Sequence, residues 1–330
     1  MVISSILLDK QFIDKNFTKL FLWIVFIINS INMLVFGYSL IRINHEINVG
    51  VFEYLNAFFR EGFPYSFMYS NPNHLGMIAG IALLLGIMVL KRENNKFAKF
   101  LYVLNILVSC INIVISHCAS CWIGLFCAIS VIVIVRFLGN DWKKRLTIIT
   151  LIGSLVVCTL MYGFVRFVVN ENNDTNIENK LNAWTSTRYE LWKDMAYAHS
   201  EKLFLGEGNI TREKQVRYQY NLDKGTDLGM DANGSLMDYK GPHNGYFAVF
   251  YCAGLLGLVA FIYILFRKIR RSPIIEDGYL YAIVVYILII NLVESMFITS
   301  VNIPCLFLFV ILNMEKERED QSKEINNEGL

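Results

Sequence analysis

Long runs of apolar residues without charge recur along this chain, and they limit the folds that it can adopt. One of them, YFAVFYCAGLLGLVAFIYILF, covers residues 246–266. A helix of about 20 apolar residues crosses the hydrocarbon core of a bilayer. Hydrophobic residues make up 55% of the 330 positions and charged residues only 18%, which excludes an ordinary soluble domain. The sequence therefore predicts an all-α integral membrane protein that crosses the bilayer several times.

The apolar runs predict about eight transmembrane helices. They lie at about 20–41, 74–90, 98–117, 119–137, 146–169, 244–266, 279–297 and 300–314. These helices divide the chain into five parts. The first is an N-terminal part with the first helix and the first outer segment (1–73), and helices two to five follow (74–169). After them come a large extracytoplasmic loop with short helices (170–243), helices six to eight (244–314) and a charged cytoplasmic tail (315–330).

Three connections between the predicted helices are rich in Lys and Arg. They read KRENNKFAK (91–99), GNDWKKR (139–145) and RKIRR (267–271), and all of them fall on one side of the membrane. Because Lys and Arg concentrate in cytoplasmic loops, that side is the cytoplasm. Both termini are then cytoplasmic, and the large loop lies outside, where we expect any chemistry. The net charge of +2 gives no reason to expect nucleic acid as a partner.

The outer loop contains the signature of a helix start in STRYELWKDMAYAHSEK, residues 186–202. Thr187 is a suitable N-cap and Glu190 follows three residues later, which makes a capping box. Arg188 then occupies the first helical position, where a cation opposes the helix dipole. A bound anion would reverse that cost, since free backbone N–H groups and the guanidinium would converge on it. The alternative is an arginine that reaches a lipid phosphate or a carboxylate of the loop.

A histidine stands where this loop enters the next apolar run, in PHNGY, residues 242–246. The dipole of the helix that begins there disfavours protonation of His243. A neutral ring can accept a proton from a hydroxyl group or donate a hydrogen bond. The alternative is a loop-end histidine in the headgroup zone that binds water or backbone. Asn244 and Gly245 are residue types that suit a helix cap and a close backbone approach.

Several motifs occur together in this region. Arg188 is followed by YELW, which places Trp192 one turn further on; FLGEG covers 204–208, and PHNGYFAVFYCAGLLGL covers 242–258. In addition, NPNHLG at 71–76 opens the second predicted span. This combination resembles the O-antigen ligase and polysaccharide repeat-unit polymerase family of bacterial cell-envelope proteins. That family has an Arg-x-x-x-Trp helix, a Gly-x-Gly segment and a His-Asn pair that opens a helix with a Gly-Leu-Leu-Gly-Leu tail.

The resemblance covers roughly residues 65–315. It implies a metal-independent glycosyl transfer, without a cofactor, at the outer face of the bacterial plasma membrane. The donor would be a glycan on undecaprenyl pyrophosphate, and the acceptor a hydroxyl group of another glycan. Arg188 would hold the pyrophosphate, His243 would activate or orient the acceptor hydroxyl, and Trp192 and Asn244 would belong to the substrate site. A flippase and a chain-length regulator are the protein partners that such an enzyme implies.

One position departs from the family pattern. Cys121 stands where members often carry an arginine at the outer start of the fourth span. A second guanidinium for the pyrophosphate must then come from elsewhere, with Arg60, Arg212 and Arg217 as candidates, or the pyrophosphate is held more weakly. Cys118 and Cys121 have a Cys-x-x-Cys spacing, but no further ligands accompany them, so we expect interfacial packing rather than metal or redox chemistry.

Some polar residues in or near the spans have two interpretations. Glu294, in NLVESMF, is an ionisable group inside a predicted span, which is costly and indicates a role in substrate binding; the alternative is a side chain that reaches outer water. Asn71 either lines the donor site or caps the second span. Asparagines at helical spacing are expected to join neighbouring helices; they are Asn29 with Asn32 and Asn105 with Asn112.

The sequence favours a polymerase that joins lipid-linked repeat units into capsular polysaccharide, exopolysaccharide or O-antigen. The first alternative is a ligase that transfers the finished glycan to lipid A core or another acceptor. The second is a lipid-glycan transporter, which would place ionisable residues deep in several spans and show pseudo-symmetric halves; the sequence shows neither. The third is a non-catalytic assembly partner, for which His243 and Arg188 would be dispensable.

Overall fold

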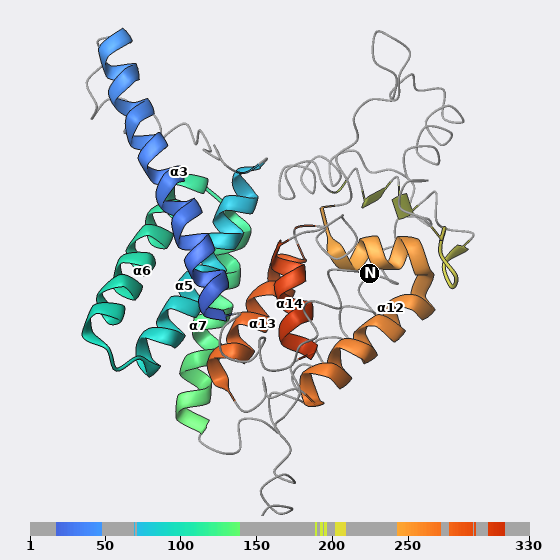
Figure 1. The fold of residues 1–330 in the computed structure, drawn as a ribbon. Helices are drawn as coiled ribbons and strands as arrows, with labels where there is room; N and C mark the ends of the chain where they lie inside the picture. The colour runs from blue at the N-terminus through green and yellow to red at the C-terminus, as the bar shows by residue number, and fades with distance from the viewer. Residues whose placement is uncertain are drawn as a thin grey trace, which may run out of the picture. The chain divides into compact units, whose positions relative to one another are not determined.

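The computed structural model of this chain describes residues 18–47, 69, 71–138, 189, 192–193, 195–196, 202–208, 243–271, 277–292, 294 and 303–313. Over these residues the regular structure is helical, without strands (Figure 1). The helices are α3 (Thr18–Ile47), α5 (Pro72–Arg92), α6 (Lys96–Ser116), α7 (Ala119–Leu138), α12 (Gly245–Arg271), α13 (Gly278–Ile290) and α14 (Ile303–Asn313). Among these described helices, five are long and apolar enough to cross a membrane, and α13 and α14 are shorter apolar helices. The prediction of an all-α polytopic membrane protein is confirmed.

The helix boundaries agree with the predicted spans to different degrees. The second, third and fourth predicted spans correspond to α5, α6 and α7 within two residues at each end. By contrast, α13 ends at Ile290 and α14 begins at Ile303, so both are shorter than predicted. The predicted span 146–169 lies outside the described residues, and the total number of spans therefore stays a prediction.

Asparagines cap two of these helices and explain where they begin. The side-chain oxygen of Asn71 accepts a hydrogen bond from the backbone N–H of Asn73 at 2.8 Å, and Pro72 stands at the first helical position. Asn95 accepts in the same way from two backbone N–H groups of α6, at 2.9 and 3.2 Å. Such caps satisfy N–H groups that a helix start leaves without partners. The capping interpretation of Asn71 is confirmed.

The chain folds into two compact units. The first consists of Met1–Gly139, Arg267–Val285 and Leu306–Leu330, and the second of Asn140–Phe266 and Tyr286–Cys305. The first unit therefore holds α3, α5, α6 and α7, whereas the second holds most of α12 and the described part of the large loop.

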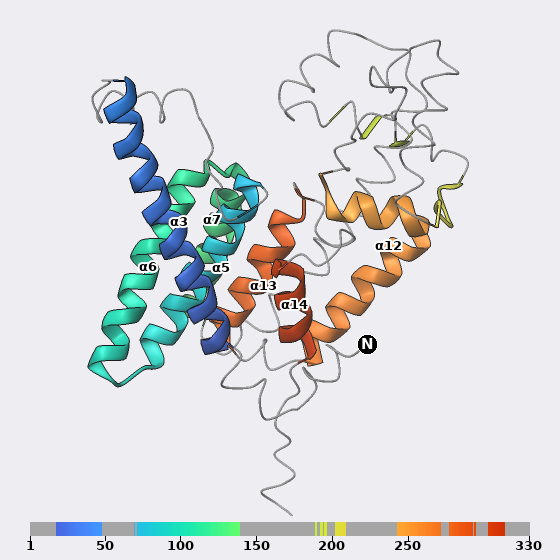
Figure 2. The same ribbon diagram turned by 45° about the horizontal axis from the view of Figure 1, so that its top comes forward.

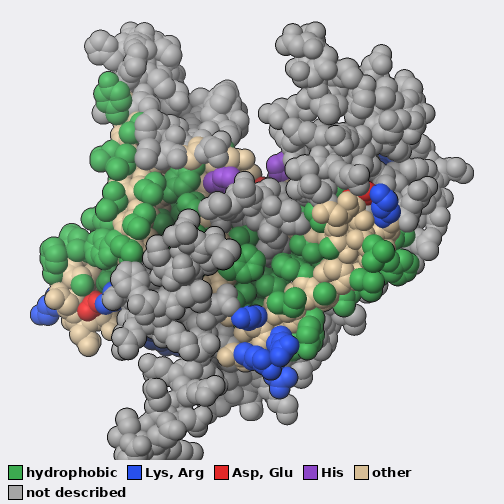
Figure 3. All heavy atoms as spheres, turned by 45° about the vertical axis from the view of Figure 1, so that its right-hand side comes forward, with side chains coloured by type: hydrophobic (Ala, Val, Ile, Leu, Met, Phe, Trp, Pro, Cys, Tyr) green, Lys and Arg blue, Asp and Glu red, His purple; other side chains and the backbone are tan. Residues whose placement is uncertain are grey.

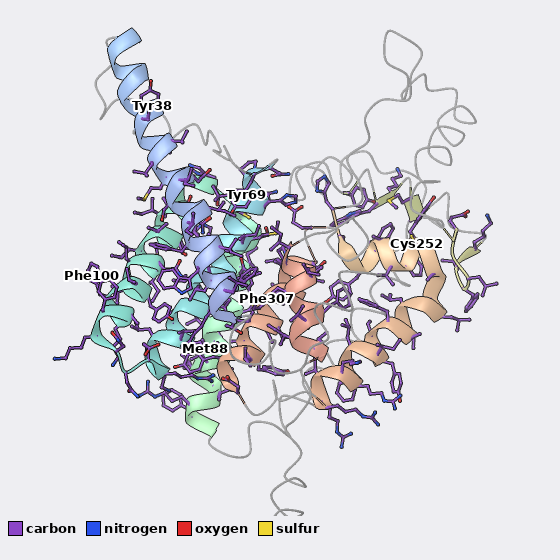
Figure 4. All side chains as sticks on the ribbon, in the orientation of Figure 1. Tyr38, Tyr69, Met88, Phe100, Cys252 and Phe307 are labelled. Atoms are coloured by element: carbon purple, nitrogen blue, oxygen red, sulfur yellow. The ribbon has the colours of Figure 1, made fainter. Side chains whose placement is uncertain are left out.

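In the first unit, α5 is the central helix. It packs against α3, α6 and α7 (Figures 1 and 2), and most of its side chains from Leu75 to Val89 are buried. On α6, Phe97, Phe100 and Leu107 are exposed instead, and Figure 4 labels Phe100. These side chains are as apolar as lipid tails, so the exposed face of α6 suits a surface in contact with lipid.

Buried polar side chains join α3 to α6. Asn32 donates through its side-chain amide to the side-chain oxygen of Asn112 at 2.9 Å, and Asn112 donates to the backbone oxygen of Asn29 at 3.1 Å. The hydroxyl of Tyr69 donates to the side chain of Asn29 at 3.0 Å. The prediction that asparagines join neighbouring helices is confirmed for these three, while Asn105 accepts a hydrogen bond within α6.

Charged pairs hold the turn between α5 and α6. Arg92 forms an ion pair with Asp277, just before α13, and Lys19 of α3 lies 3.5 Å from Glu93. The carboxylate of Glu93 accepts the backbone N–H of Asn95, and this bond, together with the charge of Lys19, lowers the pKa of Glu93. Glu93 and Asp277 thus each face a basic side chain at this end of the helices, which the sequence predicts to be cytoplasmic.

Candidate active site

In the second unit, α12 bends sharply at Gly254. This residue has φ 65° and ψ −170°, which is not helical, and Figures 1 and 2 show two arms of the helix that meet at the bend. The sequence predicts one continuous span here, so the break is an unpredicted feature. In an unbroken helix, the N–H groups of Leu255 and Leu256 would bond to the carbonyls of Tyr251 and Cys252. The break leaves these groups without helical partners.

The loop that contains FLGEG supplies the missing partners at the bend, where Figure 4 labels Cys252. Loop and helix exchange backbone hydrogen bonds, which run from Leu255 N–H to Leu203 O (2.8 Å), Leu256 N–H to Phe204 O (3.3 Å), Glu207 N–H to Tyr251 O (2.9 Å) and Gly208 N–H to Cys252 O (2.8 Å). An unsatisfied backbone group is costly within a bilayer. The loop is therefore what allows α12 to break at this point.

Two glycines make this contact possible. Gly206 in the loop and Gly254 in the helix have positive φ values of 74° and 65°. A Cβ on Gly206 would lie 2.5 Å from the backbone of Cys252, and a Cβ on Gly254 would lie 2.2 Å from the carbonyl oxygen of Phe204. Neither glycine can carry a side chain unless one backbone moves. FLGEG and GLLGL each contain a required glycine because their two backbones touch.

The first arm of α12 begins at a cap formed by Asn244. The side-chain oxygen of Asn244, a residue only 4% exposed, accepts the backbone N–H of Phe247 at 2.9 Å. His243, directly before the cap, has φ 48°, in the left-handed region that L-residues rarely adopt. Such conformations persist where the surrounding contacts enforce them, and they cluster at functional sites. The capping interpretation of Asn244 is confirmed.

The end of α13 fixes the position of this turn. Gly245 donates its N–H to the carbonyls of Asn291 at 2.7 Å and Glu294 at 3.1 Å. One residue later, the hydroxyl of Tyr246 donates to the carbonyl of Leu288 at 3.2 Å. The backbone that follows α13 thus accepts a hydrogen bond from the start of α12, which joins the two segments directly beside His243.

The imidazole of His243 faces the carboxylate of Glu294. Nδ1 of His243 and Oε2 of Glu294 are 3.4 Å apart, and the two side chains are 23% and 9% exposed. Low exposure strengthens such a contact because little water competes with it. The site therefore holds a histidine beside a largely buried acid, an arrangement suited to proton transfer.

The helical segment between residues 189 and 196 is anchored on the first arm of α12. Met195 and Ala196 are buried in a cluster with Phe247 and Phe250, and Trp192 packs against this cluster from a partly buried position. All described positions of the segment between 189 and 196 are helical. These contacts place Trp192 against the helix that His243 and Asn244 precede.

The stretch that holds this arrangement matches a known family. The family model described as O-antigen ligase matches residues 103–262, which include Trp192, the FLGEG loop, His243 and the break in α12. Over this stretch, which is just under half of the chain, the protein is similar to the O-antigen ligase family. No curated protein and no solved structure matches the chain.

Members of the O-antigen ligase family are glycosyltransferase-like membrane enzymes of the ligase and polymerase type, with lipid-linked glycans as substrates. The family expected from the motifs is therefore confirmed. The match is narrower than the stretch of roughly 65–315 over which the resemblance extends, and it leaves out Asn71 and Glu294.

The predicted site residues have different outcomes in the structure. The second unit brings His243, Asn244 and Glu294 together, and Trp192 packs against the first arm of the helix that begins there. Asn71 belongs to the first unit, where it caps α5. The candidate arginines lie outside the described residues; they are Arg188, Arg60, Arg212 and Arg217.

Cys121, at the position where the O-antigen ligase pattern often has an arginine, is completely buried in the first unit. Its thiol donates to the carbonyl of Gly76 at 3.1 Å, and the sulfur of Cys118 lies 3.1 Å from the hydroxyl of Ser120. Both cysteines are packing residues, fully buried inside the protein rather than at an interface. Within the part of the chain that the structure describes, no three His, Cys, Asp or Glu side chains are grouped to hold a metal ion.

One buried acid, Glu207, is not among the predicted site residues. Glu207 is 8% exposed, and its carboxylate lies 2.7 Å from the ammonium group of Lys202, whose side chain is 52% exposed. Carboxylates are seldom buried unless they are paired. In the sequence, the only sign that Glu207 is buried is its position between two glycines in an apolar context. This pattern does not indicate that Lys202 is its partner.

Proposed function

We propose that this protein is a membrane polymerase of lipid-linked glycans. It joins oligosaccharide repeat units carried on undecaprenyl pyrophosphate into capsular polysaccharide, exopolysaccharide or O-antigen at the outer face of the bacterial plasma membrane. The observation that carries the proposal is the position of His243, at the cap of α12, 3.4 Å from buried Glu294 and inside the stretch that matches the family.

In the proposed reaction, His243 accepts the proton of the acceptor hydroxyl. The hydroxyl oxygen attacks the anomeric carbon of the donor sugar and forms the new glycosidic bond. The bond from that carbon to the pyrophosphate oxygen breaks, and undecaprenyl pyrophosphate leaves with the electron pair. His243 then releases its proton to water. Because pyrophosphate is already a competent leaving group, one base and a set of cations can suffice.

The leaving pyrophosphate carries negative charge and needs cations near it. Arg188 is our first candidate because a guanidinium can bind phosphate oxygens through two parallel hydrogen bonds. Its neighbour in the sequence, Tyr189, is buried in the second unit. The second guanidinium that Cys121 does not supply would come from Arg60, Arg212 or Arg217.

Trp192, Asn244 and Asn71 are further candidates for the substrate site. Trp192 is partly buried beside the first arm of α12, and its ring offers a flat apolar face for a sugar. Asn244 and Asn71 use their side-chain oxygens for helix caps. The amide NH₂ group is therefore what each can offer to a sugar hydroxyl.

The charge distribution along α12 supports an outer location for the site. Its last turn carries Lys268, Arg270 and Arg271, and Figure 3 shows basic side chains gathered at this end. Lys and Arg mark the cytoplasmic side of a membrane protein, and His243 stands at the other end of the helix. We therefore propose cytoplasmic termini and an outer active site, supplied by a flippase and served by a chain-length regulator.

Strains that carry variants of this protein test the proposal. We expect His243→Ala and Arg188→Ala each to abolish long polymer and to leave lipid-linked single repeats, because the base or the anion clamp is lost. Gel electrophoresis of extracted glycans measures this as the loss of the ladder. His199→Ala, which changes another histidine of the same predicted loop, is the control and should keep the ladder. A full ladder from membrane-inserted His243→Ala protein would refute the catalytic assignment.

The description of the matching family favours a second candidate, an O-antigen ligase. Both functions use the same bond changes and the same donor. They differ in the acceptor, which is another lipid-linked glycan for the polymerase and a lipid A core or another anchor for the ligase. Supplying purified protein with each acceptor separates them.

A further inference from the structure

Glu294 is the described acid that faces the proposed catalytic base, and it lies outside the stretch that matches the family. We infer that Glu294 is a positioning residue: its carboxylate accepts a hydrogen bond from Nδ1–H of His243 and so turns Nε2 toward the acceptor hydroxyl. This inference rests on the proposed function, because it assigns Glu294 a role through His243.

The backbone holds the two side chains in register. The N–H of Gly245, two residues after His243, donates to the carbonyl of Glu294 at 3.1 Å. The N–H of Glu294 donates to the carbonyl of Ile290 at 2.9 Å. Both ends of the side-chain contact are thus tied to one local backbone network, and the carboxylate is placed before substrate binds. The distance of 3.4 Å is long for a hydrogen bond, and catalytic hydrogen bonds are often long without substrate and tighten in the substrate complex.

The chemistry of the donor argues against a contact between Glu294 and the pyrophosphate. A carboxylate beside the pyrophosphate would repel it. A carboxylate on Nδ1 of the imidazole does two useful things instead. It fixes the tautomer in which Nε2 is unprotonated, and it stabilises the imidazolium that forms when Nε2 takes the proton. We therefore propose an indirect role for Glu294, whereas substrate binding by Glu294 stays a prediction from the sequence.

Glu294→Gln tests this role, because it keeps the size of the side chain and removes the charge. The probe is the undecaprenyl-pyrophosphate-linked glycan isolated from a strain that lacks the protein, and the assay follows polymer formation by purified protein in detergent. We expect kcat to fall roughly 10- to 100-fold, the loss seen when the carboxylate partner of a metal-bound histidine is removed, with KM for the donor unchanged. Glu294→Asp retains the charge, so its kcat should lie between those of the wild type and Glu294→Gln.

The tautomer of His243 is a readout that does not depend on turnover. In protein labelled with ¹⁵N-histidine, the resonances that His243→Ala removes identify the ring. We expect protonated Nδ1 in the wild type and in Glu294→Asp, and a shift of the proton toward Nε2 in Glu294→Gln. Gel filtration and the other histidine resonances show whether each variant is folded. If Glu294→Gln does not fold, the reduced kcat expected for Glu294→Asp is the test.

The possible results separate this inference from the proposed function. A rise in KM with unchanged kcat would show that Glu294 binds substrate and would overturn the inference. A wild-type kcat in Glu294→Gln, together with an inactive His243→Ala, would also overturn the inference but leave the proposed function standing. If only Glu294→Asp folds, a wild-type kcat in that variant would have the same meaning. Polymer formation by His243→Ala would overturn the proposed function, and the role of Glu294 with it.

Discussion

At the scale of single residues, the pair of Glu207 and Lys202 shows how a buried charge is tolerated in the loop that bridges α12. Lys202→Ala would leave the carboxylate of Glu207 at 8% exposure without this cation. We expect the free energy of unfolding to fall by roughly 1–2 kcal/mol, the lower part of the usual range for a buried polar group that loses its partner. The cost stays below that of a fully buried pair because water screens Lys202. Unfolding in detergent measures it.

Glu207→Gln separates the charge of this side chain from its shape. Glutamine fills nearly the same space without a charge, so Lys202→Ala should cost much less in the Glu207→Gln background. An equal cost in both backgrounds would show that the ion pair contributes nothing to stability.

Two acids illustrate what the sequence can show at this scale. Glu294 stands out because an ionisable residue in an apolar run is costly. Its partner His243 is 51 residues away in the sequence, and only the fold shows that their side chains meet. Glu207 is close to Lys202 in the sequence, yet its burial comes from the contact with α12, which no local pattern indicates.

At the scale of elements, the contact between the FLGEG loop and α12 depends on the absence of side chains. Gly206→Ala and Gly254→Ala would place a Cβ 2.5 Å and 2.2 Å from backbone atoms. We expect each variant to lose several kcal/mol of stability or to fail to fold, since backbone cannot yield as a side chain can. Any protein that folds should form little polymer, because the bend places the first arm of α12 and its cap. Thermal unfolding and the glycan ladder measure the two effects.

Gly208→Ala is the matched control for these variants. Gly208 also has a positive φ, 79°, but an added Cβ would meet nothing within 4 Å. Only the backbone strain remains, which costs about 1–2 kcal/mol. If Gly208→Ala were as damaging as Gly206→Ala, close contact would not be the reason for the glycines.

The elements differ in how far the sequence predicts them. The starts of α5 and α6 carry asparagine caps, and they lie within two residues of the predicted starts. The run that forms α12 is uniformly apolar, so hydropathy predicts an unbroken span. A single glycine in a helix is usually tolerated, and the break at Gly254 becomes favourable only through hydrogen bonds to a loop more than forty residues earlier.

At the scale of the whole molecule, long apolar runs and basic connections are enough to predict an all-helical membrane protein. The motifs Arg-x-x-x-Trp, Gly-x-Gly and His-Asn are enough to predict its family, because they are local in the sequence. Sequence patterns do not show how the second unit forms its site. That site depends on the cap of α12, the end of α13 and the bridging loop, which meet only after folding.

Transfer by purified protein tests the central claim most directly. Labelled undecaprenyl-pyrophosphate-linked repeat units from a strain that lacks the protein are incubated with wild-type protein and with His243→Ala, in the presence of a metal chelator. The account predicts that the wild type alone converts the label into a ladder of repeat multiples, without any added second acceptor. A ladder of equal length from His243→Ala would contradict it, and so would transfer by the wild type only to an added lipid A core.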